Sequence, residues 1–118
     1  MYFSSLSRTT RAVFIGVVYT VQVAQVNAQI LPDNTLGTEN STVVPNQTIR
    51  GIRSERIDGG AVRGNNLFHS FQEFNIDEGR GAYFSNPEGI QNILSRVTGE
   101  NPSNILGVLG VLGNANLF

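Results

Sequence analysis

Residues 104–118, NILGVLGVLGNANLF, are the stretch that decides the expected fold. This stretch begins and ends with the same pattern, an asparagine followed by two bulky apolar residues. The pattern also begins at Asn66 and Asn92, so there are four copies, and the last three begin twelve residues apart. Self-similarity at a fixed spacing indicates a repeat fold, in which each unit is too small to bury its apolar face alone and stacks on the next. Three copies carry a further apolar residue, at Phe71, Val97 and Leu109.

The interior of this stretch argues against a helix. Gly107, Gly110 and Gly113 interrupt the run, and each glycine in a helix interior costs about 1 kcal/mol relative to alanine. A leucine- and valine-rich run with glycines at its bends is typical of a strand that is buried on both faces in a parallel stack. We therefore expect a strand of this kind over residues 105–112.

The first half of the chain is also divided into short apolar runs and turn signals. Residues 29–45 read as an irregular lead-in that contains one short strand at 42–44. Residues 48–63 alternate in polarity and contain the turn signal Asp58-Gly59-Gly60. This segment fits either a β-hairpin or two successive strands of a β-helix.

Residues 66–76 form the densest aromatic run. The three-residue spacing of its phenylalanines fits a helix face, but the turn residues on both flanks favour a strand. Residues 82–84 read as a short strand, while 90–97 fit either a helical turn or a strand, of which we favour the strand. Asparagine suits the corners of such a coil because it tolerates left-handed backbone and hydrogen-bonds neighbouring chain. The pattern therefore predicts an all-β fold, a parallel β-helix.

The composition excludes several function classes. The chain has 118 residues, 40% of them hydrophobic and 14% charged, which suits one modest domain. It has eight arginines, no lysine and a net charge of -1, so a nucleic-acid partner is not expected. The lack of cysteine rules out disulfides and thiolate metal sites, and one histidine cannot form a histidine cluster. We expect no cofactor and no metal.

The first 28 residues have the order of a secretory signal peptide. Arg8 and Arg11 precede an apolar stretch that ends in small residues, so cleavage is expected between Ala28 and Gln29. The alternatives are a membrane anchor or a buried helix, but the apolar stretch is shorter than the roughly 20 residues that a spanning helix needs and contains polar breaks. Residues 29–118 then carry six arginines and nine acidic residues, a net charge of -3.

No residues form a convincing catalytic constellation. His69 lies among phenylalanines and is expected to be a packed or hydrogen-bonded strand residue. Asp58 and the Asp77-Glu78 pair could be imagined as an acid and base, but their glycine-rich surroundings favour solvated turn carboxylates. The glycine run at 107–113 lacks the spacing of a phosphate-binding loop. We therefore expect neither an enzyme nor a small-molecule substrate.

Parts of the chain resemble a known protein family. Four segments carry the resemblance: NLFHSF at 66–71, YFSNPEGI at 83–90, RVTG at 96–99 and GNANLF at 113–118. They are similar to the N-terminal two-partner-secretion (TPS) domain of filamentous-haemagglutinin-like exoproteins, also called the haemagglutination activity domain, and most similar to cyanobacterial versions. The resemblance covers residues 30–118.

The resemblance implies a right-handed, single-stranded parallel β-helix with an N-terminal cap, following a signal peptide. It implies that the domain is the address by which an outer-membrane barrel transporter of the TpsB type, through its periplasmic POTRA domains, recognises and exports the exoprotein. Asn114-Ala115-Asn116-Leu117 resembles the family's Asn-x-Asn-Leu motif. By resemblance, Asn66, Asn114, Asn116 and Leu117 are expected to serve transporter recognition or the geometry of the coils.

The resemblance also predicts an incomplete domain. A second family motif, Asn-Pro-Asn-Gly-Ile, would follow a few residues after Leu117, while Asn86-Pro87-Glu88-Gly89-Ile90 is similar in letters but lies earlier. We therefore expect residues 29–118 to be part of a TPS domain, incomplete at its C-terminal end. The alternative function is an adhesin or structural surface fragment that binds glycans or other cells.

Overall fold

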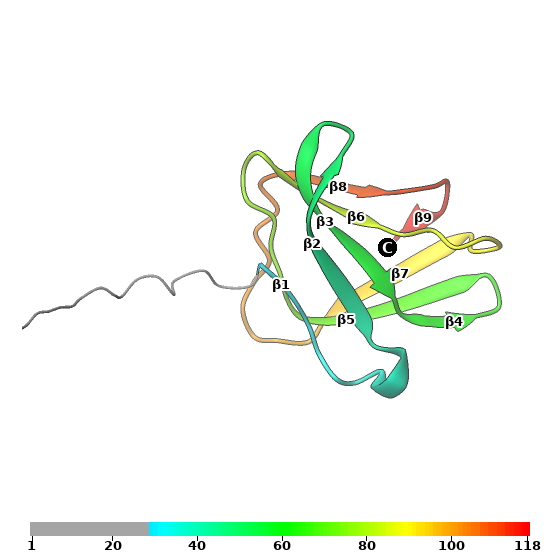
Figure 1. The fold of residues 1–118 in the computed structure, drawn as a ribbon. Coiled ribbons are helices and arrows are strands. Elements are labelled where there is room, and N and C mark those ends of the chain that lie inside the picture. The colour runs from blue at the N-terminus through cyan, green and yellow to red at the C-terminus, as the bar shows by residue number, and fades with distance from the viewer. Residues whose placement is uncertain (1–28) are drawn as a thin grey trace, which may run out of the picture.

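The computed structural model describes residues 29–118, which contain β-strands, one 3-10 turn and no α-helix. This confirms the all-β prediction (Figure 1). The strands are β1 (Ile30–Pro32), β2 (Ser41–Ile49), β3 (Ile52–Gly59), β4 (Ala61–Arg63), β5 (Asn66–Phe74), β6 (Arg80–Phe84), β7 (Asn92–Val97), β8 (Val108–Val111) and β9 (Asn116–Leu117), and the 3-10 turn spans Gly37–Glu39.

The strands form two sheets, of which one has the order β1-β5-β7-β9, with β4 also paired to β5, and the other has the order β2-β3-β6-β8. From β5 onward the chain visits the two sheets alternately, so that it winds in coils (Figure 1). Neighbouring coils pair in parallel, β5 with β7, β7 with β9, and β6 with β8. We call residues 66–91 the first coil and residues 92–115 the second coil.

The start of the chain covers the edges of the first coil, with β1 and β4 antiparallel to β5 and with β3 parallel to β6. One edge of β5 is paired to β4 over Asn66–Phe68 and to β1 over Phe71–Phe74. In the other sheet, β2 pairs antiparallel with β3. Unpaired strand edges promote aggregation, so these strands protect this end of the coils.

Residues 48–63 do contain a hairpin turn, but it does not lie at the predicted turn signal Asp58-Gly59-Gly60. β2 and β3 form an antiparallel hairpin whose turn is Arg50-Gly51, with φ of 52° and 80° at the two turn residues. Two positive φ angles are the signature of a tight hairpin turn whose twist matches that of the strands. Gly59 and Gly60 instead carry the chain from β3 in one sheet to β4 in the other.

The lead-in prediction for residues 29–45 is partly wrong. The short strand predicted at 42–44 exists, but β2 begins at Ser41 and continues through Pro45 to Ile49. Proline fits here because β2 is an edge strand, so its missing N–H costs no ladder hydrogen bond on the open side. The register of the hairpin shifts between Val44 and Gln47, beside this proline.

The core lies between the two sheets and is rich in aromatic rings. Phe71, Phe74 and Phe84 are buried, with the rings of Phe71 and Phe74 edge to face at 5.0 Å and those of Phe74 and Phe84 stacked at 5.9 Å. Such pairs add stability beyond that from burial of their apolar area. The strand prediction for the aromatic run is confirmed, because β5 spans Asn66–Phe74 and Ile76 is buried in a parallel bridge to Ile105.

The strand predictions for residues 82–84 and 90–97 are confirmed by β6 and β7. The prediction that residues 105–112 form a strand buried on both faces is wrong. Only Val108–Val111 form a strand, β8, and Leu106 and Leu109 are 66% and 41% exposed. The reason is that β8 is an edge strand, with β6 as its single neighbour in the described residues. Gly110 has a specific packing role, because a Cβ there would lie 2.7 Å from the Tyr83 ring.

Candidate functional site

A ladder of asparagine side chains runs across the coils. Asn66, Asn92 and Asn116 occupy equivalent positions on β5, β7 and β9. Asn92 donates its side-chain amide hydrogen to Oδ1 of Asn66 at 3.0 Å, and Asn116 donates to Oδ1 of Asn92 at 3.2 Å. We call these three residues the asparagine ladder. Each step joins one coil to the next, as in stacked β-structures where identical amides align.

An apolar column lies directly beside the ladder. Leu67, Ile93 and Leu117 follow the three ladder asparagines and are paired in register. Leu67 and Ile93 are fully buried, and Leu117 is half-buried and packs against the core. The repeated pattern of asparagine followed by an apolar residue therefore places an amide at the sheet surface and a hydrophobic side chain inside.

The copy at Asn104 does not belong to the ladder, which corrects the twelve-residue spacing. The ladder steps are 26 and 24 residues long, so one full coil is about twice the predicted repeat. The copy at Asn104 lies half a coil away, where its backbone N–H donates to Oδ1 of Asn75 at 2.8 Å. Phe71 and Val97 do pair, but Leu109 pairs with Ala82 in the other sheet.

Two further asparagines, missed by the sequence reasoning, hold the corners of the coil. Oδ1 of Asn75 accepts the N–H of Asn104, and Oδ1 of Asn86 accepts the N–H of Ala115 at 2.8 Å. Asn86 also donates to the carbonyl of Ile90 at 3.1 Å. The expectation that the repeated asparagines form corners is wrong for Asn66, Asn92 and Asn116, which lie in strands. The Asn86-Pro87 turn signal was the available clue to the second corner.

Of the remaining predicted site residues, some lie at the asparagine ladder and others do not. Asn116 and Leu117 join the ladder and the column, whereas Asn114 is exposed in the bend before β9 and makes no side-chain hydrogen bond to any described residue. Ala28 and the rest of the predicted signal peptide lie outside the described residues. Gln29 is described, and its carbonyl accepts the backbone N–H of Asn75 at 2.7 Å.

His69 is packed and hydrogen-bonded, as predicted. It is 2% exposed, and its ring lies 5.1 Å from the ring of Phe84. Its Nδ1 is 2.8 Å from Oγ of Ser41, which itself accepts the N–H of Ser70 at 3.2 Å. The other ring nitrogen, Nε2, has no hydrogen-bond partner in the described residues. Burial lowers the pKa of His69 to about 4, although the nearby Asp58 carboxylate opposes this shift.

The acidic residues considered as an acid and base do not form a pair. Asp58 accepts a bidentate ion pair from Arg56, whose Nη2 is 2.9 Å away, and a hydrogen bond from Ser85. The Arg56 guanidinium lowers the pKa of Asp58. Asp77 and Glu78 are exposed beside a separate turn. In residues 29–118 no cluster of three metal-ligating side chains occurs.

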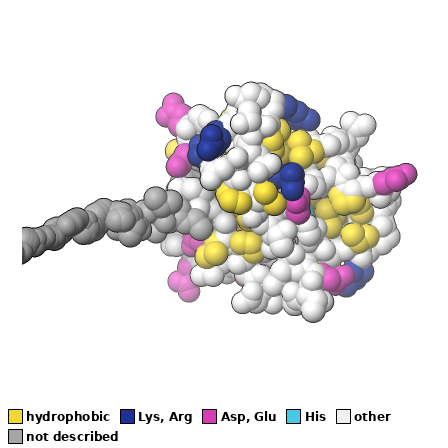
Figure 2. Space-filling model, viewed as in Figure 1, with side chains coloured by type: hydrophobic (Ala, Val, Ile, Leu, Met, Phe, Trp, Pro, Cys, Tyr) yellow, Lys and Arg dark blue, Asp and Glu magenta, His cyan; other side chains and the backbone are white. Residues whose placement is uncertain are grey.

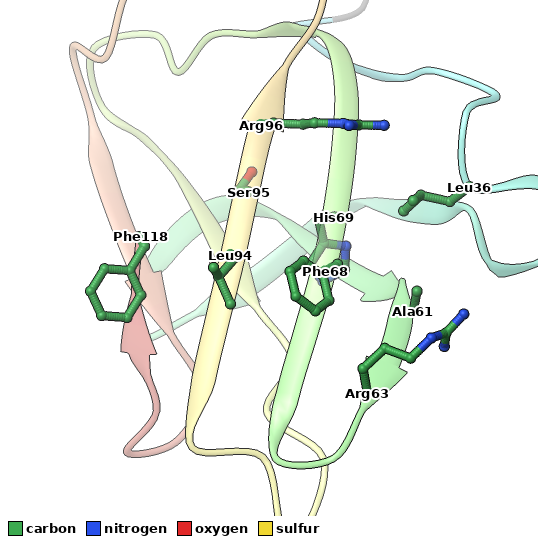
Figure 3. Close-up of a pocket in the computed structure, with 9 residues that line it drawn as sticks. All are labelled: Leu36, Ala61, Arg63, Phe68, His69, Leu94, Ser95, Arg96 and Phe118. Carbon is green, nitrogen blue, oxygen red and sulfur yellow. The ribbon is translucent and has the colours of Figure 1, made fainter.

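A pocket of about 590 Å³ opens on the outer face of the sheet that contains β5, β7 and β9 (Figure 3). Figure 3 shows Phe68, Leu94 and Phe118 in a row across neighbouring strands, with Arg96 above the row and Arg63 below it. The lining residues are Leu36, Ala61, Arg63, Phe68, His69, Leu94, Ser95, Arg96 and Phe118. Arg63 is already paired with Glu39 at 2.8 Å.

Charges of both signs are interspersed on the surface, and Figure 2 shows no field of one sign on the face in view. Over the part of the chain that the structure describes, no helix is long and apolar enough to cross a membrane. The strand pairing and the asparagine hydrogen bonds together define a β-domain of stacked coils, in which polar side chains join one coil to the next.

The comparison with protein families identifies this class. The family described as the TPS secretion domain matches residues 28–118, so the chain belongs to this family. TPS secretion domains are non-catalytic modules that target exoproteins for two-partner secretion, and proteins of this family are secreted across the outer membrane. Searches of curated proteins and of solved structures gave no match.

Proposed function

We propose that residues 29–118 are the secretion address of an exoprotein, recognised by the POTRA domains of an outer-membrane barrel transporter of the TpsB type. The family match over residues 28–118 carries this proposal. The exoprotein would be a large adhesin or haemagglutinin-like protein of which this chain is a part. The transporter would engage the strands near the N-terminal cap while they are extended, with main-chain hydrogen bonds supplying affinity and side chains supplying specificity.

We further propose that the folded product is the start of a right-handed parallel β-helix with an N-terminal cap. The alternation of the chain between two sheets and the parallel pairing of successive coils support this architecture. In such a helix each coil is the template for the next, so the buried column Leu67–Ile93–Leu117 is repeated at equivalent positions.

The predicted site residues divide into two roles in this proposal. Asn66, Asn116 and Leu117 hold the geometry of the coils, because they lie in the ladder and the column. Asn114 is the candidate for transporter recognition, because its side chain is exposed and makes no hydrogen bond within residues 29–118. Residues 1–28 are proposed to be a signal peptide cleaved between Ala28 and Gln29, so that no stable membrane anchor is expected within residues 29–118.

Binding to the POTRA domains tests this function. The purified chain, both folded and freshly diluted from urea, would be presented to the POTRA domains of its cognate TpsB-type transporter. We expect binding in the extended state, reduced by excess of the same domains as free competitor. Lack of binding in both states would contradict the proposal.

A further inference from the structure

A polar network fastens the start of the chain across the outside of the coils. We call residues 30–40, which include β1 and the 3-10 turn, the N-terminal strap. The carboxylate of Asp33 in the strap accepts hydrogen bonds from Oγ of Ser70 at 2.7 Å and from Oγ1 of Thr98 at 2.6 Å. It also accepts the backbone N–H of Thr35 at 3.0 Å. Ser70 is 1% exposed, so the strap closes over it.

Arg96 completes this network through two hydroxyl groups. Its Nε donates to Oγ of Ser70 at 2.9 Å, and its Nη2 donates to Oγ1 of Thr35 at 2.8 Å. Both hydroxyls in turn donate to Asp33, with Oγ1 of Thr35 at 2.7 Å from the carboxylate. The Arg96 guanidinium and the Asp33 carboxylate are thus linked through two hydroxyl groups, each of which accepts from Arg96 and donates to Asp33. Because one partner in each of these hydrogen bonds is charged, they are stronger than bonds between neutral groups.

Two of these partners belong to the second coil. Ser70 lies in β5 of the first coil, whereas Arg96 and Thr98 come from β7 and the residue after it. The contacts of the strap with Arg96 and Thr98 span 61 and 65 residues. Repeat folds usually depend on contacts between adjacent units, so a strap that reaches past the first coil is unusual. The network is complete only when the second coil is in place.

The pKa of Asp33 depends on the same contacts. Burial by itself would raise the pKa of this carboxyl, but hydrogen bonds from Thr98, Thr35 and Ser70 outweigh burial and hold the pKa well below its ordinary value. Without the second coil, Asp33 would lose the hydroxyl of Thr98 and the guanidinium that orients the other two hydroxyls. The strap would then be held by β1, which has three residues and a shifted register, by Ser70 and by the exposed ion pair of Glu39 with Arg63.

We infer that the N-terminal strap is a latch that closes when the second coil folds. While the latch is open, the β1 segment is an extended strand free to pair with a strand of the transporter, and closure withdraws it. This inference rests on the proposed function and adds its regulation: formation of the second coil ends recognition. The apolar residue Ile30, which is 5% exposed in the closed strap, would be released together with β1.

Hydrogen exchange of the purified chain tests the latch itself. The variants Thr98→Val and Arg96→Gln/Thr98→Val remove hydrogen-bond partners in the second coil and change no residue of the strap. Exchange of the strap amides should accelerate about tenfold or more, while amides of β6 and β8 keep their protection. Arg53→Gln is the matched control, because Arg53 is exposed on β3 in the other sheet. Unchanged strap exchange in both variants, with β6 and β8 intact, would overturn the inference.

Binding to the POTRA domains tests the link to recognition. The folded latch variants should bind several-fold more tightly than the folded parent chain. If the strap opens but affinity stays the same, regulation by the latch is wrong, while binding of the urea-diluted parent chain still supports the proposed function. If no form of the chain binds, the proposed function fails, whereas the exchange result still decides whether the latch exists.

Discussion

Asn92 donates a hydrogen bond to Asn66 across 3.0 Å, although the two residues are 26 positions apart in the sequence. The bond aligns β7 on β5 at the same place where Ile93 aligns on Leu67. A slip of one residue would break the amide contact and turn the buried column outward, because side chains alternate between the faces of a strand. The asparagine ladder therefore specifies the register of the coils as well as adding hydrogen bonds.

Replacing Asn92 by alanine should destabilise the domain. Asn92 is the central rung, which donates to Asn66 and accepts from Asn116, so two side-chain hydrogen bonds are lost. We expect a loss of about 1 to 2 kcal/mol in the free energy of unfolding, measured by urea denaturation. Asn114→Ala is the matched control and should change stability by less than about 0.5 kcal/mol, because Asn114 is exposed. Equal effects of the two substitutions would contradict a stabilising ladder.

The same ladder shows what the sequence could and could not predict. The repeated asparagine and apolar pattern correctly indicated stacked β-structure, because one face of each strand must be buried. It did not reveal that the Asn104 copy is half a coil away, since the coils of 26 and 24 residues leave copies on both sides of the molecule. Sequence spacing alone cannot say which sheet a strand joins.

The strap network was beyond prediction for a different reason. Asp33, Ser70 and Thr98 are single polar residues with no motif, and they meet only because the coils bring together residues up to 65 positions apart. The exposure of Leu106 was also unpredictable, because an apolar run reads alike in a central strand and in an edge strand. By contrast, the local signal in His69 and its phenylalanine neighbours was sufficient to predict a packed residue.

Gly110 should not tolerate a side chain. The Tyr83 ring lies against it, 3% exposed, and the guanidinium of Arg50 sits 5.2 Å from the centre of that ring. A Cβ at position 110 would approach the ring to 2.7 Å, so Gly110→Ala should cost about 1 to 3 kcal/mol in unfolding free energy. In a Tyr83→Ala background the same substitution should cost clearly less, as a double-mutant cycle by denaturation would show. Identical costs in both backgrounds would mean that the ring is not the obstacle.

Mild acid should destabilise the domain through His69. Its pKa is about 4 in the folded chain against an ordinary value of 6.5, so the unfolded chain binds the proton more readily. The contribution of neutral His69 to the free energy of unfolding is therefore fully present above about pH 6.5. It is lost as the pH drops toward 4, by on the order of 3 kcal/mol at most.

Urea denaturation at a series of pH values checks this dependence. Above about pH 5.5 the carboxylates with lowered pKa values, Asp33, Glu39 and Asp58, stay charged in both the folded and the unfolded state, so His69 dominates the change there. His69→Gln keeps an acceptor for Ser41 but cannot titrate, and its stability should be nearly flat over this range. A His69→Gln variant that loses stability as steeply as the parent would assign the effect to another group.

Asn114 and Asn116 should differ in secretion. Asn116→Ala removes a ladder hydrogen bond and should lower the stability of the folded product, whereas Asn114→Ala should leave stability unchanged and reduce export. Export is measured as the fraction of chain in the medium of cells that carry the transporter. Normal export of Asn114→Ala would exclude this side chain from recognition.

Transporter-dependent export tests the central claim most directly. The whole chain, fused at its C-terminus to an unfolded reporter peptide, would be expressed in a Gram-negative host with and without its cognate TpsB-type transporter. If residues 29–118 are a secretion address, the reporter reaches the medium only when the transporter is present. Retention of the reporter in the periplasm in both strains, with the chain intact there, would contradict the account.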